Sequence, residues 1–216
     1  MNNFWQTIHT YCEAHTTPLS DILYELERET HLKTLAPQMM SGPLQGRLLN
    51  LLVKLARPKV ALEIGAFTGY AALCIAEGLP AGAVLHTIEV NKELEYIIRK
   101  YLDRSGLSDK VMLHIGKAEQ IIPELPARFD WVFIDAGKQN YAMLYDLVIE
   151  RMNPGGLILA DNTLWSGKVA TRQNDPDTRI LHAFNEKVQN DARVENILLP
   201  IRDGLMVARV KNGCEV

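Results

Sequence analysis

Two acidic residues of this chain follow apolar segments and have the right chemistry to hold a cation. Asp135 comes directly after the run 129–134, and Asp161 and Asn162 follow the run 156–160. Carboxylate and amide oxygens form a hard, oxygen-only ligand set that suits Mg²⁺, with Mn²⁺ or Ca²⁺ as alternatives. Taken singly, each residue is more typical of a turn or a helix cap. Their joint placement at the ends of two strands favours a metal site.

Lys138 lies three residues after Asp135 and is a candidate for proton transfer. An isolated lysine is usually a solvated surface charge. An ammonium group has a pKa of about 10.4 in water, and it becomes a base when a nearby cation or loss of water lowers that value. The spacing therefore makes Lys138 a candidate general base beside the predicted metal.

A glycine turn, from Glu63 to Tyr70, connects a β-rich run to an apolar helix. It lacks the full G-x-G-x-x-G pattern, and the acidic Glu63 disfavours an anionic pyrophosphate, so a cationic or zwitterionic ligand is expected. About twenty residues on, Glu89 ends the next strand, where doubly wound folds bind a ribose diol. A generic strand–helix turn explains a lone glycine turn about as well. The two glutamates together favour a nucleoside ligand.

The elements that must position these residues can be read from the apolar pattern. Helical spacing from Phe4 to about Ala56, with breaks near Pro18 and Pro37, predicts a helical N-terminal extension (1–57) before an α/β core (58–216) in a single domain. In the core, five β-rich runs alternate with helical stretches near Leu73, Leu94, Ile121 and Leu144. This alternation predicts a parallel, doubly wound sheet whose ligands lie at the carboxyl ends of the strands. The five predicted strands are Val60–Ile64, Ala83–Val90, Val111–Ile115, Phe129–Ile134 and Gly156–Ala160.

The last two β-rich runs, Val194–Pro200 and Leu205–Val210, are separated by 201–204 alone. That connection is too short for a helical crossover, so we expect the two strands to pair antiparallel.

The motif Leu62-Glu63-Ile64-Gly65-x-x-x-Gly69-Tyr70, with Ile88-Glu89 after it, resembles the first two motifs of class I S-adenosylmethionine methyltransferases. The resemblance implies a Rossmann-like fold with a mixed seven-stranded sheet. It also implies that Gly65 lets the backbone approach the methionine portion of S-adenosyl-L-methionine, that Glu63 lies near it and that Glu89 binds the ribose hydroxyls. Met39 and Ser41 would close over the cofactor. The cofactor residues that it implies are Met39, Ser41, Glu63, Gly65, Phe67, Glu89, Ala118 and Asp135.

A second set, Asp135-x-x-Lys138, Tyr141 and Asp161-Asn162-Thr163-Leu164-Trp165, resembles the cation-dependent O-methyltransferases, which include catechol and caffeoyl-CoA O-methyltransferases. The match runs from about Met39 to Val210. It implies that Asp135, Asp161 and Asn162 bind the metal, that Lys138 is the base and that Trp165 walls the acceptor pocket, although a core role explains Trp165 equally well. The implied reaction methylates one hydroxyl of a metal-chelated, catechol-like small molecule, and the family implies a homodimer.

The sequence departs from the animal catechol enzymes at three places. Gly137 stands before Lys138 where those enzymes carry an aromatic residue, which predicts a wider acceptor mouth. Ala118 lies in the segment where they use a Ser-Gln pair near the adenine, and Ala71 replaces a cofactor-side serine. The polar segment 166–177 is either an ordinary surface loop or a cover for the acceptor.

Composition narrows the class of protein. The net charge of −3 gives no general reason to bind a polyanion. The three cysteines, Cys12, Cys74 and Cys214, lack the pairing of a disulfide scaffold, which indicates a reducing, cytoplasmic setting. No signal-peptide pattern and no run of about eighteen apolar residues is present, so we expect a soluble protein without membrane contact.

Two other functions stay open at this point. The first is methylation of 5-hydroxyuridine in tRNA by the same metal-assisted chemistry, which the mild acidity disfavours, although Lys168, Arg172 and Arg179 offer a local basic patch. The second is a noncatalytic sensor that binds S-adenosylmethionine, which the intact Asp135 and Lys138 argue against.

Overall fold

A computed structural model describes residues 3–125 and 128–213 of the chain. The N-terminal extension forms three helices, α1 (Asn3–Ala14), α2 (Asp21–Lys33) and α3 (Gly42–Ala56), with a 3₁₀ turn, η1 (Pro37–Met39), before the third. Pro18 lies between α1 and α2, and Pro37 opens η1. Both breaks fall where predicted, because proline lacks the amide hydrogen that a helix interior needs.

The core is a seven-stranded sheet with the strand order β3-β2-β1-β4-β5-β7-β6. The first five strands are parallel, and β7 runs antiparallel to both β5 and β6. The mixed sheet and the antiparallel pairing of the last two strands are confirmed. The strands are β1 (Val60–Ile64), β2 (Val84–Glu89), β3 (Val111–Ile115), β4 (Phe129–Ile134), β5 (Met152–Ala160), β6 (Val194–Leu199) and β7 (Leu205–Val210).

The prediction for the fifth strand was wrong at its start, since β5 begins at Met152 rather than Gly156. Met152 pairs with Phe129, and the register then shifts before Trp131 pairs with Leu157. Pro154 and the glycines after it are typical of a turn, so the sequence pattern does not indicate this irregular start of the strand.

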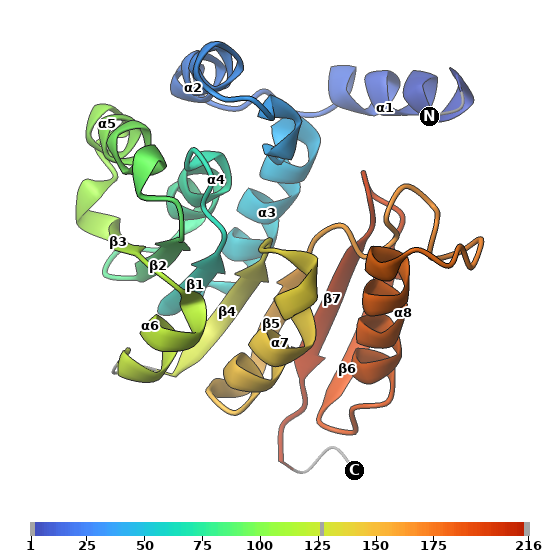
Figure 1. Cartoon of the computed structure of the whole chain (residues 1–216). Helices are drawn as coiled ribbons and strands as arrows, with labels where there is room; N and C mark the ends of the chain where they lie inside the picture. Colours follow the sequence, from blue (N-terminus) through green and yellow to red (C-terminus); the bar gives the residue numbers. More distant parts are fainter. Residues whose placement is uncertain (1–2, 126–127, 214–216) are drawn as a thin grey trace.

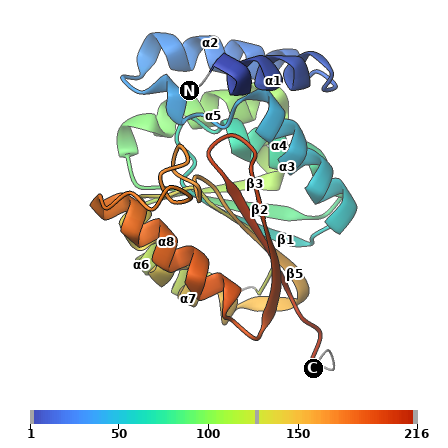
Figure 2. The ribbon, with the colours of Figure 1, turned by 90° about the vertical axis from the view of Figure 1, so that its right-hand side faces the viewer.

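The sheet lies between two layers of helices (Figures 1 and 2). On one face lie α2, α3, α4 and α5, and on the other lie α6, α7 and α8. Neighbouring residues of the central strands alternate between the two cores, as Phe133 and Ile134 do. The remaining helices are α4 (Tyr70–Gly78), α5 (Glu95–Ser105), α6 (Ala118–Glu124), α7 (Tyr141–Ile149) and α8 (Pro176–Gln189), with 3₁₀ turns η2 (Lys92–Leu94), η3 (Ser108–Lys110) and η4 (Lys138–Asn140).

None of the helices in the described ranges has the length and apolar character needed to cross a membrane. Cys12 and Cys74 are free thiols, and Cys214 lies outside the described residues.

Candidate active site

The glycine turn after β1 passes very close to the end of β4. Gly65 has a φ of +100°, and a Cβ atom at this position would lie 2.0 Å from the carbonyl oxygen of Asp135. The Gly65 amide donates a hydrogen bond of 2.9 Å to the carbonyl of Ile88 at the end of β2. Only glycine fits both the left-handed conformation and this contact, so Gly65 holds the ends of three neighbouring strands together.

Glu89 at the end of β2 is almost fully buried and accepts two backbone hydrogen bonds. Its Oε2 accepts from the amide of Phe67 at 2.7 Å, and its Oε1 accepts from the amide of Asn91 at 2.8 Å. Burial raises the pKa of this carboxyl, against the lowering effect of the backbone amides. An ionised carboxylate offers about four acceptor sites, so Glu89 retains capacity for a pair of hydroxyl groups.

Glu63 on β1 is completely buried, and one of its oxygens is unpaired. Thr87 donates a short hydrogen bond to Oε2, whereas Oε1 has no partner among the described residues. Burial raises the pKa of the Glu63 carboxyl to about 8, with a further contribution from the charges of Asp135 and Glu89. A cationic ligand group would offset the cost of ionising this side chain.

The segment before α3 closes a small cavity against the glycine turn. Ser41 is buried and Met39 is 58% exposed. The cavity brings five of the predicted cofactor residues together, whereas Ala118 lies at the start of α6 and packs against the core, away from this cavity. The cavity is lined by Met39, Met40, Ser41, Gly65, Ala66, Phe67, Tyr70, Ala71 and Asp135. Of these, the sequence prediction missed Met40, Ala66 and Tyr70, although Tyr70 stands in the quoted motif.

The two acidic residues lie side by side at the carboxyl edge of the sheet. The Asp135 amide donates to the carbonyl of Ile64 at 2.9 Å, and the Asp161 amide donates to that of Ile134 at 3.0 Å. Asp161 is 1% exposed. Burial and the negative charge of Asp161 raise the pKa of Asp135, and the positive charges of Lys138 and Arg202 oppose this effect. Two carboxylates crowded in a poorly hydrated place favour a bound cation.

Asn162 completes the predicted ligand set in a left-handed conformation, with a φ of +57°. Its Oδ1 accepts a hydrogen bond of 3.1 Å from the Nζ atom of Lys138. The same Nζ lies 4.7 Å from the centre of the Trp165 ring. Trp165 also packs against the core, as one of the two alternatives for this residue expected, and its role as a wall of the acceptor pocket stays a prediction.

Two residues around Asp161 were missed by the sequence prediction. Gln45 of α3 donates a hydrogen bond of 2.9 Å from Nε2 to the Asp161 Oδ2, and an Arg202 nitrogen lies 3.5 Å from the same oxygen. The backbone carbonyl of Asp161 accepts a 2.9 Å bond from the hydroxyl of Tyr141. The weak signals in the sequence were a glutamine among the apolar residues of a helix and an arginine in a tight turn.

The donor set fits a hard divalent cation. Within the described ranges, no three His, Cys, Asp or Glu side chains form a cluster that could hold a metal ion. The candidate set instead has two carboxylates and one amide oxygen, which is the chemistry of a Mg²⁺ site that keeps positions open for water or substrate.

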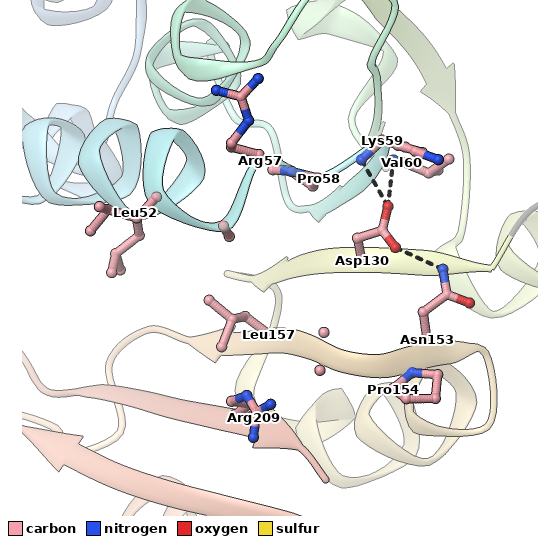
Figure 3. A pocket seen from close by; sticks show the side chains of 14 residues that line it. Leu52, Arg57, Pro58, Lys59, Val60, Asp130, Asn153, Pro154, Leu157 and Arg209 are labelled. Atoms are coloured by element: carbon pink, nitrogen blue, oxygen red, sulfur yellow. Dashed lines mark hydrogen bonds between the residues drawn. The ribbon is translucent and has the colours of Figure 1, made fainter. Parts of the chain in front are cut away.

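A second cavity, of about 690 Å³, lies at the opposite edge of the sheet (Figure 3). Its central carboxylate has a structural role: Asp130 accepts three hydrogen bonds, from the backbone amides of Lys59 and Val60 at 2.8 and 3.1 Å and from the side-chain amide of Asn153 at 2.7 Å. These bonds fix the starts of β1 and β5 to β4. The candidate active site therefore remains at the carboxyl edge.

Comparisons with known proteins identify the family of the chain. The model of a family described as O-methyltransferase matches residues 13–211. Caffeoyl-CoA O-methyltransferase of Stellaria longipes is 30% identical, over 88% of this chain and 83% of its own length. Tricin synthase 2 of Oryza sativa subsp. japonica is 34% identical over 79% of this chain, and the match spans 63% of the length of that protein.

Solved structures give the same result for the fold. The SAH-bound methyltransferase PaMTH1 of Podospora anserina has a TM-score of 0.90 and 28% identity, with 98% of this chain and 97% of that chain covered. The O-methyltransferase from Bacillus cereus in complex with SAH has a TM-score of 0.89 and 28% identity, with coverage of 98% and 100%. From its sequence, its sheet and its strand-end residues together, the chain belongs to the cation-dependent, class I S-adenosylmethionine O-methyltransferase family.

Proposed function

We propose that this protein transfers a methyl group from S-adenosyl-L-methionine to one hydroxyl of a catechol-like small molecule that is chelated on a divalent metal. The observation that carries the proposal is the cluster at the carboxyl edge, where Asp135, Asp161 and Asn162 lie together and Lys138 contacts Asn162. Relatives named caffeoyl-CoA O-methyltransferase and tricin synthase support a phenolic acceptor.

The cofactor side of the proposal depends on Glu63 and Glu89. The unpaired Oε1 of Glu63 suits the ammonium group of the methionine portion, and Glu89 has acceptor capacity for the ribose diol. Gly65 lets the backbone approach that ligand closely. Structures of similar methyltransferases described as SAH-bound or in complex with SAM support this choice of ligand.

The metal side of the proposal assigns Asp135, Asp161 and Asn162 as ligands, with Mg²⁺ as the first choice. When bound, the metal supplies Lewis-acid stabilisation of the acceptor oxygen and fixes its direction. Lys138 Nζ, held between Asn162 and the Trp165 ring, accepts the proton of the attacking hydroxyl. Trp165 gives an aromatic acceptor a face to pack on, and the exposed Gly137 leaves the entrance wide.

The test is a methyl-transfer assay with labelled cofactor on catechol, caffeoyl-CoA and tRNA, each with Mg²⁺, Mn²⁺ or Ca²⁺ and with EDTA. We expect turnover of a small molecule that EDTA abolishes and that Asp161→Ala lacks. Activity in Asp161→Ala equal to that of the wild type, with or without EDTA, would overturn the metal assignment. Methylation of tRNA alone would replace the small-molecule acceptor, and cofactor binding without turnover of any acceptor would indicate a sensor.

We also propose that the protein forms a homodimer and that it works in the reducing environment of the cytoplasm. Helix α1 projects from the body of the molecule (Figure 1), with Phe4, Trp5 and Tyr11 each more than half exposed. A second copy offers an identical apolar surface for isologous packing, and the free thiols of Cys12 and Cys74 suit a reducing compartment. Light scattering should give a dimer for the wild type and a monomer for Trp5→Asp, and a monomeric wild type would contradict this part.

A further inference from the structure

Arg202 lies in the turn between β6 and β7 and joins three parts of the site. One of its guanidinium nitrogens, Nη1, lies 3.5 Å from the Asp161 Oδ2 and donates a 3.3 Å bond to the Gln45 Oε1. The other, Nη2, donates to the carbonyl oxygen of Met40 at 3.0 Å. The side chain is 22% exposed, so these bonds form in a place that is largely shielded from water.

Gln45 forms hydrogen bonds with both Asp161 and Arg202. Its side chain is fully buried, and it donates from Nε2 to Asp161 while it accepts at Oε1 from Arg202. These two bonds need opposite ends of the amide, so they fix its orientation. Arg202 and Gln45 together therefore hold the Asp161 carboxylate in one orientation.

The turn that carries Arg202 is fixed to the segment after Asp161. The Thr163 amide donates to the carbonyl of Gly204 at 3.0 Å, and the Leu164 amide donates to that of Asp203 at 2.8 Å. A Cβ atom on Gly204, which has a φ of +95°, would lie 2.4 Å from the Leu164 nitrogen. The backbone directly after Arg202 is thus tied to the segment that follows Asp161, and the Arg202 guanidinium reaches across to the carbonyl of Met40.

We propose that Arg202 and Gln45 are positioning residues that connect the cofactor segment Met39–Ser41 to the metal ligand Asp161, so that cofactor and metal bind cooperatively. The inference deepens the proposed function and rests on it. Met39, Met40 and Ser41 all line the cofactor cavity, and the Met40 carbonyl is bonded to Arg202. A ligand that orders this segment also orders Arg202, and through it the carboxylate that receives the metal. Such coupling is reciprocal by thermodynamic necessity.

Calorimetry on the full chain tests the proposal, with Mn²⁺ as the metal probe and S-adenosylhomocysteine as the cofactor probe. In the wild type we expect each ligand to raise the affinity of the other by about 5-fold or more. In Arg202→Met and Gln45→Met, the affinity for one ligand in the presence of the other, divided by its affinity alone, should fall close to one. This ratio should also fall in Arg202→Lys, because an ammonium is a point charge without the planar fork that spans three acceptors. Arg99→Met, which removes an exposed arginine on α5, should keep the wild-type ratio.

The outcomes separate the two claims. If the wild type binds neither probe, the proposed function is wrong. If it binds both probes independently, only the proposed cooperativity is wrong. Wild-type coupling in a folded Arg202→Met protein would overturn the role of Arg202. Melting temperatures identify any variant that fails to fold, and in that case Gln45→Met and Arg202→Lys decide the matter.

Discussion

The Nζ atom of Lys138 donates a 3.1 Å hydrogen bond to the Oδ1 of Asn162. The proposed base and one proposed metal ligand are therefore in direct contact. An amide oxygen has two lone pairs, so Asn162 can face a cation and still hold Lys138. In the proposed mechanism, this contact fixes the position of Lys138 relative to the acceptor hydroxyl.

Replacing Lys138 with methionine should lower kcat by about 10²- to 10⁴-fold, the usual contribution of a positioned general base. The Kd of S-adenosylhomocysteine should not change, because Lys138 does not line the cofactor cavity. Lys138→Arg should be equally slow, since a guanidinium keeps the charge but does not give up its proton. Steady-state kinetics and calorimetry check both points, and an active Lys138→Arg enzyme would rule out proton transfer by this residue.

Replacing Trp165 with leucine should raise the KM of an aromatic acceptor. The change removes the ring that faces Lys138 and that we assign to acceptor packing, an interaction of roughly 1 kcal/mol, or about five-fold in affinity. Trp165→Phe keeps an aromatic face and should recover most of the loss. Equal KM values for the wild type and Trp165→Leu would leave the residue with its core role alone.

Gly65→Ala should destabilise the protein more than Gly82→Ala. Both glycines have a positive φ, so both substitutions strain the backbone by about 1 kcal/mol or more. At Gly65 the new methyl group also meets the carbonyl of Asp135, whereas nothing lies within 4 Å at Gly82. Overpacking adds about 1–3 kcal/mol. The difference in stability between the two variants, measured by thermal unfolding, gives this added cost. Equal losses of stability would mean that β1 and β4 move apart easily enough at this point to accommodate the methyl group.

Glu63 should make stability fall as the pH rises. Its pKa is about 8 in the folded chain and 4.5 in its ordinary state, so between these values the folded state holds a proton that the unfolded state has lost. The free energy of unfolding then falls by about 1.4 kcal/mol per pH unit over this window and levels off above it. Glu63→Gln cannot ionise and lacks this decline.

Melting curves of the ligand-free protein at pH 5 to 8.5 measure the effect of Glu63. The advantage of Glu63→Gln over the wild type should grow across this range, whereas Glu119→Gln, which changes an exposed carboxylate on α6, should show a constant difference. A constant difference for Glu63→Gln would mean that its carboxylate is ionised throughout.

The strand framework was predictable from the sequence because each central strand is buried on both faces. Leu62 and Ile64 pack into one core while Ala61 packs into the other, which produces a continuous apolar run with a clear end. The residues that follow such runs then lie at one edge of the sheet. For this reason Asp135 and Asp161 could be assigned to a common site without coordinates.

The surroundings of that site could not be read in the same way. Gln45 lies 116 positions before Asp161 in the chain, and no spacing rule relates a buried amide in α3 to a carboxylate after β5. Arg202 is one of five residues in a short connection between β6 and β7, and its three acceptors come from separate elements. Such contacts depend on how helices and turns dock onto the sheet, which local patterns do not encode.

The junction that Arg202 forms with Gln45, Met40 and Asp161 also has a consequence for how the protein gains and loses activity. Gln45 and Arg202 are 157 positions apart in the chain, so no fragment that lacks either end of this span can assemble the junction. Long-range contacts of this kind form late, because the chain must first lose the entropy of closing large loops. Metal binding would therefore report completion of the whole fold, and heat inactivation should coincide with global unfolding rather than precede it.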